Sequence, residues 1–207
     1  YAVRRFGRRR GIHAGTLGGL GALSVGGPFD LIVVCDVLQY VPEGDPDRQN
    51  PGGISVPSPA YDMILDAAAR SLKVHGATDI LFIGDSGPNQ KGLQSAAARL
   101  NKEWADSGVR VHYIGDYYHS PAFNKWLRSQ GETAESIGTH AGIEDTSELM
   151  AINPDYIRKD KLAPGGDFKV TGVSGNPARA SVAYGKQGLE FKIAAAVAQI
   201  RKVVGGR

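Results

Sequence analysis

The sequence predicts an α/β protein in which helices cover a mostly parallel central sheet. From residue 30 onward, short apolar runs alternate with longer amphipathic stretches, in a strand, helix, strand order. The apolar runs are continuous rather than alternating, which is typical of strands buried on both faces of a parallel sheet. The chain has 207 residues, 42% hydrophobic and 22% charged, which is ordinary for one globular domain.

Three apolar runs predict the strands, at residues 31–35, 79–83 and 109–114. The first run ends at Cys35, the single cysteine of the chain. Cys35 therefore has no partner for an internal disulfide, and we expect it to be a small core residue rather than a nucleophile.

Helices are predicted around these strands, at residues 59–75, 90–105, 121–130, 143–152 and 187–204. The first has the clearest ends, because Ser58 can cap it, Pro59 suits the first helical position and Gly76 suits a stop. One apolar stripe runs along it, formed by Tyr61, Leu65, Ala68 and Leu72.

Residues 1–29 differ from the rest of the chain. Five arginines and no acid occur in the first ten residues, and without them the chain has 19 basic and 21 acidic residues. We expect an Arg-rich helix with a solvated face, in preference to a surface that binds nucleic acid or an anionic membrane. No basic stripe with interleaved aromatic residues occurs elsewhere, so no nucleic-acid partner is predicted.

Seven glycines in residues 11–28 predict a mobile or disordered loop. A phosphate-binding loop is disfavoured because neither G-x-G-x-x-G nor G-K-[ST] occurs there. A shifted reading frame is a further alternative, so this stretch is not assigned as native. The α/β domain is predicted to cover residues 30–207.

No run of about 18 apolar residues occurs, so no membrane span or membrane partner is expected. The chain opens at Tyr1 without a visible signal peptide, and a lost leader or N-terminal piece is an open alternative. A cytoplasmic location is the default expectation, with export as the alternative.

Two loops are candidate sites, because ligands of parallel sheets bind at the carboxyl ends of the strands. The first loop, residues 84–90, follows the second strand, and the second, residues 138–147, is dense in histidine, carboxylate and hydroxyl groups. Turn formation and helix capping are the alternative explanations for both. His119 follows the third strand and is a candidate pocket residue.

These loops carry a resemblance to the creatininase family. The second resembles the family's H-A-G-x-x-E-T-S motif, with Asp145 in place of the glutamate. Residues 84–89 are similar to its N-G-H-G-G-N loop, and residues 51–56 resemble its P-G-T-I-S-x segment. The resemblance covers about residues 34–163.

The resemblance implies a layered α/β/α sandwich, assembly as homo-oligomers, often hexamers, and two divalent ions, zinc or manganese. In such enzymes the metals activate a water that hydrolyses a small amide or cyclic amide. Known members act on creatinine, a formamide or a peptide precursor, so the resemblance does not fix the small-molecule substrate. It implies catalytic roles for His140, Glu144 and Asp145, substrate contacts for Ser86, Asn89 and His119, and Asp85 as a remaining metal ligand.

The sequence departs from the family where the metal ligands are expected. The family's N-terminal E-x-H-G-x-H-x-P-x-x-x-D segment does not occur, and Ser86 replaces the loop histidine. A neutral hydroxyl is a poor zinc ligand, and the acids and histidine that are left are too few for two metals. Two hypotheses follow: an incomplete copy of a metal-dependent amidohydrolase, or a divergent member or inactive fragment that only binds a small molecule.

Overall fold

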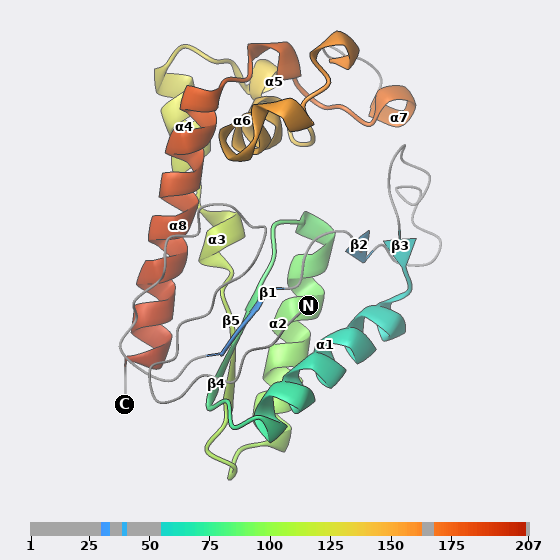
Figure 1. Ribbon diagram of the computed structural model, residues 1–207, viewed down its shortest axis with the longest axis vertical. Coiled ribbons are helices and arrows are strands. Elements are labelled where there is room, and N and C mark those ends of the chain that lie inside the picture. The colour runs from blue at the N-terminus through green and yellow to red at the C-terminus, as the bar shows by residue number, and fades with distance from the viewer. Residues whose placement is uncertain (1–29, 34–38, 41–54, 163–167, 206–207) are drawn as a thin grey trace.

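The computed structural model describes residues 30–33, 39–40, 55–162 and 168–205 (Figure 1). The predictions for residues 1–29, for Cys35 and for residues 51–54 lie outside this part of the chain. The main sheet has the strand order β1-β4-β5, and both strand pairs are parallel. Its strands are β1 (Asp30–Val33), β4 (Asp79–Ile83) and β5 (Arg110–Tyr113).

All strand pairs of the described residues are parallel, as the continuous apolar runs predict. A second, two-stranded sheet joins β2 (Gln39–Tyr40) to β3 (Ser55–Val56). In the main sheet, Ile80 of the central strand lies opposite Asp30 on one side and Val111 on the other. The central strand is buried along nearly its whole length.

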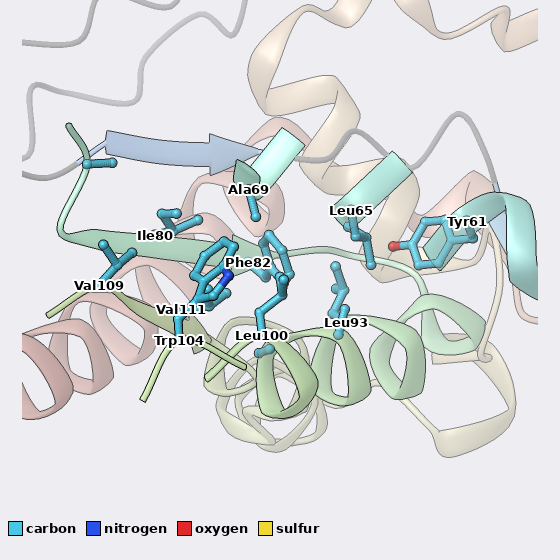
Figure 2. Packing of buried hydrophobic residues seen from close by; sticks show 13 residues of the cluster. Tyr61, Leu65, Ala69, Ile80, Phe82, Leu93, Leu100, Trp104, Val109 and Val111 are labelled. Carbon is cyan, nitrogen blue, oxygen red and sulfur yellow. The ribbon is translucent and has the colours of Figure 1, made fainter. Parts of the chain in front are cut away.

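Two helices, α1 (Ser58–Val74) and α2 (Gly87–Glu103), pack on one face of the sheet. Figure 2 shows the side chains of this core, where Ile80 and Phe82 of β4 meet residues of both helices. Full burial of one such large apolar side chain contributes about 1.5–3 kcal/mol. Contacting residues of this core include Tyr61, Leu65, Ala69, Leu93, Leu100, Trp104 and Val111.

The opposite face of the sheet is covered by α8 (Val182–Val204). Leu81 lies between Ile80 and Phe82 in the strand and points the other way, as the period of two requires. It packs with Ile114 against Ala196 and Ile200 of α8. Helices therefore lie on both faces of the parallel sheet.

The predicted start of α1 is one residue too late, and that of α2 is three residues too late. Pro57 occupies the N-cap of α1, so Ser58 is already helical and is not the cap. The helix ends before Gly76, whose φ of +88° suits glycine. Ser86 takes the extended N-cap position of α2, and Pro88 fits its first turn, so the predicted loop 84–90 is only three residues long.

The last helix starts five residues earlier than predicted. Ser181 caps it by accepting a hydrogen bond from the Tyr184 N–H at 3.1 Å. Gly185 and Gly188 lie inside it, where glycine has low helix propensity. A Cβ on Gly185 would overlap the backbone oxygen of Ser147, so this glycine lets α8 approach the helix that carries the second motif loop.

That helix is α6 (Ile143–Ile152), which matches its prediction, as α4 (Ala122–Ser129) nearly does. The pattern did not predict the short elements, which have too few residues to show a period. They are α3 (Asp116–His119), α5 (Ala134–Ile137), α7 (Phe168–Thr171) and the 3-10 helices Pro154–Tyr156, Lys159–Lys161 and Pro177–Arg179.

The described part of the fold is thus helix-rich with a small parallel sheet. The complete layered α/β/α sandwich and the domain boundary at residue 30 stay predictions. Across the described ranges, none of the helices has the length and apolar character needed to cross a membrane.

Candidate active site at the carboxyl ends of the strands

The loop after β4 is held in place by a glutamine of α2. The Gln90 amide nitrogen donates to the backbone oxygens of Gly84, at 3.0 Å, and Ser86, at 2.8 Å. Ser86 is 7% exposed, and Asn89 in the first helical turn is completely buried. The two hydrogen bonds from Gln90 therefore hold the backbone of this loop in place. The predicted substrate contacts of Ser86 and Asn89 stay predictions.

The same glutamine connects this loop to the end of β5. Its Oε1 accepts a hydrogen bond from the Tyr113 hydroxyl at 2.7 Å, and that hydroxyl lies 3.2 Å from Nε2 of His119. Burial raises the pKa of Tyr113 above its ordinary value, so it remains a neutral donor. The chain of contacts brings Ser86 and His119, two predicted binding residues, to one edge of the sheet.

His140 of the second loop is exposed and is tied to the segment that follows α7. Its Nδ1 lies 2.6 Å from the Gly172 carbonyl, and its ring meets Phe168 edge to face with centroids 5.5 Å apart. A carbonyl oxygen only accepts hydrogen bonds, so Nδ1 carries the proton. In the neutral ring Nε2 is then the unprotonated nitrogen, which suits proton transfer.

Asp145, predicted to be catalytic, holds the backbone of the second loop. Its Oδ2 accepts a hydrogen bond from the Ala141 N–H at 2.6 Å. The Thr146 hydroxyl donates to the Ala141 carbonyl at 3.1 Å. Together these bonds stabilise Ala141 at a φ of 52°, a left-handed conformation that is unfavourable for alanine.

The most charged part of the site joins three separate elements through Lys192. Its Nζ lies 2.9 and 3.0 Å from the two carboxylate oxygens of Asp85, and 2.7 Å from Oε2 of Glu148. Asp85 follows β4, Glu148 lies on α6 and Lys192 on α8, and Figure 1 shows these two helices crossing at the upper end of α8. We call Asp85, Glu144, Glu148 and Lys192 the acid–lysine cluster.

Sequence reasoning missed Glu148 and Lys192. One signal was present: Glu144 and Glu148 are four residues apart on one helix face, where two like charges are unfavourable without a cation. The cation itself comes from 44 residues beyond Glu148, and no local pattern marks it.

Burial dominates the electrostatics of the two glutamates. It raises the pKa of Glu148 to about 7; Lys192 opposes this rise, and Asp85 and Asp145 add to it. Burial also raises the pKa of Glu144, opposed by a hydrogen bond from Asn124 and by Lys192. Within the described residues, Oε1 of each glutamate is buried and has no hydrogen-bond partner.

For Lys192, the charges of its neighbours outweigh the effect of burial on its pKa. Burial alone would lower the pKa of its ammonium, but the charges of Glu148 and Asp85 raise it well above the ordinary value. The side chain is only 13% exposed. Lys192 is therefore a permanently charged cation inside the protein.

The residues present do not fit the two-metal centre that the family resemblance implies. In the ranges that the structure describes, no group of three or more histidine, cysteine, aspartate or glutamate side chains is arranged to hold a metal ion. Asp85 is bound to an ammonium, and Ser86 offers a neutral hydroxyl.

A cavity of about 650 Å³ lies beside the second loop, between α5 and the segment after α7. Its wall includes Ser136, Thr139, Phe168, Ser174 and Asn176. Thr139 is adjacent to His140, and Phe168 contacts the His140 ring. The cavity is large enough for a small molecule close to the second loop.

Comparison with known proteins gives a family model, creatininase (creatinine amidohydrolase), that matches residues 22–200. A curated relative, the mycofactocin precursor peptide peptidase of Mycolicibacterium smegmatis, is 28% identical over 141 residues. The match covers 68% of this chain and 48% of that protein, so the chain spans about half the length of this relative.

Solved creatininase structures share the fold at low sequence identity. A creatininase in its Mn form is 19% identical with a TM-score of 0.62, and a mutant creatininase complexed with creatine is 20% identical with a TM-score of 0.61. A mutant of Zn-Zn type is 19% identical with a TM-score of 0.59. Each match covers 79% of this chain and 72% of the other. With the family model matching most of its length, the chain belongs to the creatininase family.

Proposed function

We propose that this protein is an amidohydrolase that cleaves the C–N bond of a small amide or cyclic amide. Family membership supports the reaction class, since creatinine amidohydrolase and a precursor peptide peptidase both act on such bonds. The finer expectation, that a zinc- or manganese-activated water attacks the carbonyl, rests on the resemblance and on relatives of Mn and Zn-Zn type. The described residues do not supply that metal centre.

The observation that carries the proposal is the buried carboxylate of Glu148. Its Oε1 has no partner in the described structure, and its pKa of about 7 is close to working pH. A carboxyl group with such a pKa both accepts and returns a proton efficiently, as amide hydrolysis requires. We assign Glu148 as the general base toward water, and Lys192 as the residue that positions it.

The residues predicted from the sequence complete this scheme. We propose that Nε2 of His140, once protonated, donates a proton to the leaving nitrogen, and that Glu144 shares the work of proton transfer. Asp145 acts in our proposal by holding the loop of His140 in place. Substrate contacts are proposed for Ser86, Asn89 and His119.

The test is hydrolysis of creatinine, a formamide and a short peptide amide, each with chelator, with manganese and with zinc. We expect turnover of at least one substrate, and a loss of roughly 100-fold or more in kcat for Glu148→Gln and for His140→Asn. Lys186→Met, on the exposed face of α8, is the matched control and should keep the wild-type rate. Wild-type rates in both site variants would refute these assignments.

A second function is favoured by the acid–lysine cluster itself. Ser86 stands where the family has a histidine, and Asp85 beside it is bound to a lysine, so a divergent member could bind a small molecule without hydrolysing it. Saturable ligand binding by calorimetry, without product in any metal condition, would select this function. Light scattering after gel filtration tests the proposed homo-oligomer, with a hexamer as the expected form.

A further inference from the structure

We propose that the outer edge of β5 is closed by the chain's own side chains, which occupy its backbone groups as a further strand would. This closure ends the sheet at β5 and keeps a second copy of the chain from pairing with it. The proposal rests on the hydrogen bonds of the strand backbone. It does not depend on whether the protein hydrolyses an amide.

The backbone of β5 has one side that faces β4 and one side that faces away from it. The N–H groups of Arg110 and Ile114 donate to backbone oxygens of β4 and the residue before it, at 2.9 and 2.8 Å. Because these groups alternate in direction along a strand, those of Val109, Val111 and Tyr113 point away from β4. In the described part of the chain, only β4 pairs with β5. Outward groups on such an edge are a template for another extended chain.

Asn101 of α2 occupies both outward groups of Val111. Its amide nitrogen donates to the Val111 carbonyl at 2.7 Å, and its Oδ1 accepts a hydrogen bond from the Val111 N–H at 2.8 Å. Two antiparallel strands bond in the same way, because one residue both donates to and accepts from the residue opposite. The side-chain amide of Asn101 therefore replaces a neighbouring strand at the middle of β5.

The outward groups before and after Val111 are also bonded to side chains. Gln199 of α8, on the sheet face opposite to α2 (Figure 1), donates from Nε2 to the Tyr113 carbonyl at 3.1 Å. The Val109 N–H donates to the Ser107 hydroxyl at 3.3 Å, and the Val109 carbonyl accepts from the Arg110 guanidinium at 3.0 Å. Side chains from both helical layers and from the strand itself thus close this edge.

Without these side chains, β5 would suit pairing with a second copy. Val111 and Tyr113 are of the β-branched and aromatic types that favour strands, and the strand contains no proline. Two copies related by a two-fold axis would meet as antiparallel strands, so Val111 could exchange both hydrogen bonds with its counterpart. Asn101 blocks the centre of that pairing.

The experiment measures molar mass by gel filtration with light scattering, at protein concentrations up to about 100 μM. Asn101→Ala is the main variant, because alanine keeps the helix propensity of α2 and removes both hydrogen bonds to Val111. Gln199→Ala, which frees the Tyr113 carbonyl, is the second. Lys102→Ala, on the exposed side of α2, is the matched control. Hydrogen exchange of the Val111 amide is followed in every sample, and circular dichroism reports whether it is folded.

We expect Asn101→Ala to keep the circular dichroism of wild type and to reach at least about twice its mass at the highest concentration. Gln199→Ala should show a smaller rise, and Lys102→Ala none. The Val111 amide should be protected in wild type at every concentration. In dilute Asn101→Ala it should exchange at least about tenfold faster, and protection should return as the mass rises.

Three results would overturn the proposal. The first is folded Asn101→Ala with the wild-type mass at every concentration. The second is association of Asn101→Ala while the Val111 amide stays unprotected, because the copies then meet at another surface. The third is rapid exchange of the Val111 amide in wild type. If Asn101→Ala does not fold, the wild-type mass for Gln199→Ala at the highest concentration has the same consequence.

Discussion

Glu132 and Glu148 each expose only 6% of their surface, and each is paired with a cation, but Glu148 lies in the more deeply buried surroundings. Around Glu132, Arg179 donates to both carboxylate oxygens, at 2.6 and 2.9 Å. Ser136 and Tyr184 donate further hydrogen bonds to the same carboxylate. Glu148 has one short contact, to Lys192, which it shares with Asp85.

The two carboxylates respond in opposite directions. The hydrogen bonds from Arg179 hold the pKa of Glu132 below its ordinary value, whereas burial raises the pKa of Glu148 to about 7. Equal surface exposure therefore does not decide the charge of a glutamate. Deep burial raises the pKa of Glu148, whereas the donors that meet the oxygens of Glu132 lower its pKa, and this separates a structural carboxylate from one suited to proton transfer.

The largest effect that tests this contrast is expected from Lys192→Met in chelator at pH 8. It leaves Glu148 and Asp85 without their cation, which typically costs about 3–5 kcal/mol of unfolding free energy. At pH 5.5 the loss should be smaller, because Glu148 then binds a proton. Urea unfolding at both pH values measures this, with Lys186→Met as the control; an equal loss at both would contradict the role of Glu148.

A smaller loss is expected from Glu132→Gln. It removes the negative charge and turns one of the two acceptor oxygens into an amide nitrogen that only donates, opposite the donors of Arg179 and its neighbours. Since Arg179 is half exposed, we expect a loss of about 1–2 kcal/mol at pH 7. The folded-state pKa of Glu132 is lowered below its ordinary value of 4.5. Its carboxylate therefore stabilises the folded protein fully above pH 4.5, and this stabilisation is lost as the pH falls through the folded-state pKa. The difference between wild type and variant, measured by urea unfolding, should therefore vanish in strong acid.

The smallest effect at neutral pH is expected from Glu148→Gln, whose unfolding free energy should lie within about 1 kcal/mol of wild type. The substitution removes the ion pair with Lys192, but it also removes the cost of burying a charged carboxylate. Its pH dependence is the sharper test. The folded-state pKa is raised, so the folded protein gains from protonation below 4.5 and loses this contribution as pH rises through about 7. Wild type should lose stability relative to the variant across that window, and parallel stability curves would refute the raised pKa.

Much of the fold follows from local patterns. The strand at residues 79–83 and the helix at 143–152 agree with their predicted bounds, because continuous apolar runs and amphipathic periods are local properties. The start of α8 was missed because Gly185 and Gly188 weaken the helical pattern. Their purpose is tertiary: they let other elements approach the helix closely.

The site was predictable only in part, for the same physical reason. Asp85, Ser86 and His140 were selected because the loops that hold them are rich in polar residues, and their roles stay predictions; the loop of His140 follows the helix α5 and not a strand. Lys192 was missed because it lies in the middle of a helix, and its two partners are 44 and 107 residues away in sequence. Such a pairing exists only in the folded chain.

The sequence separation between Lys192 and its acids also orders events during synthesis. Chains emerge N-terminus first at about 5–20 residues per second, so the lysine follows Glu148 out of the ribosome by about 2–9 s. Over that interval the two acids are neutralised only by dissolved ions. Arrival of α8 then exchanges these ions for a tethered ammonium, so the charge of the site is balanced only after both α6 and α8 have been made.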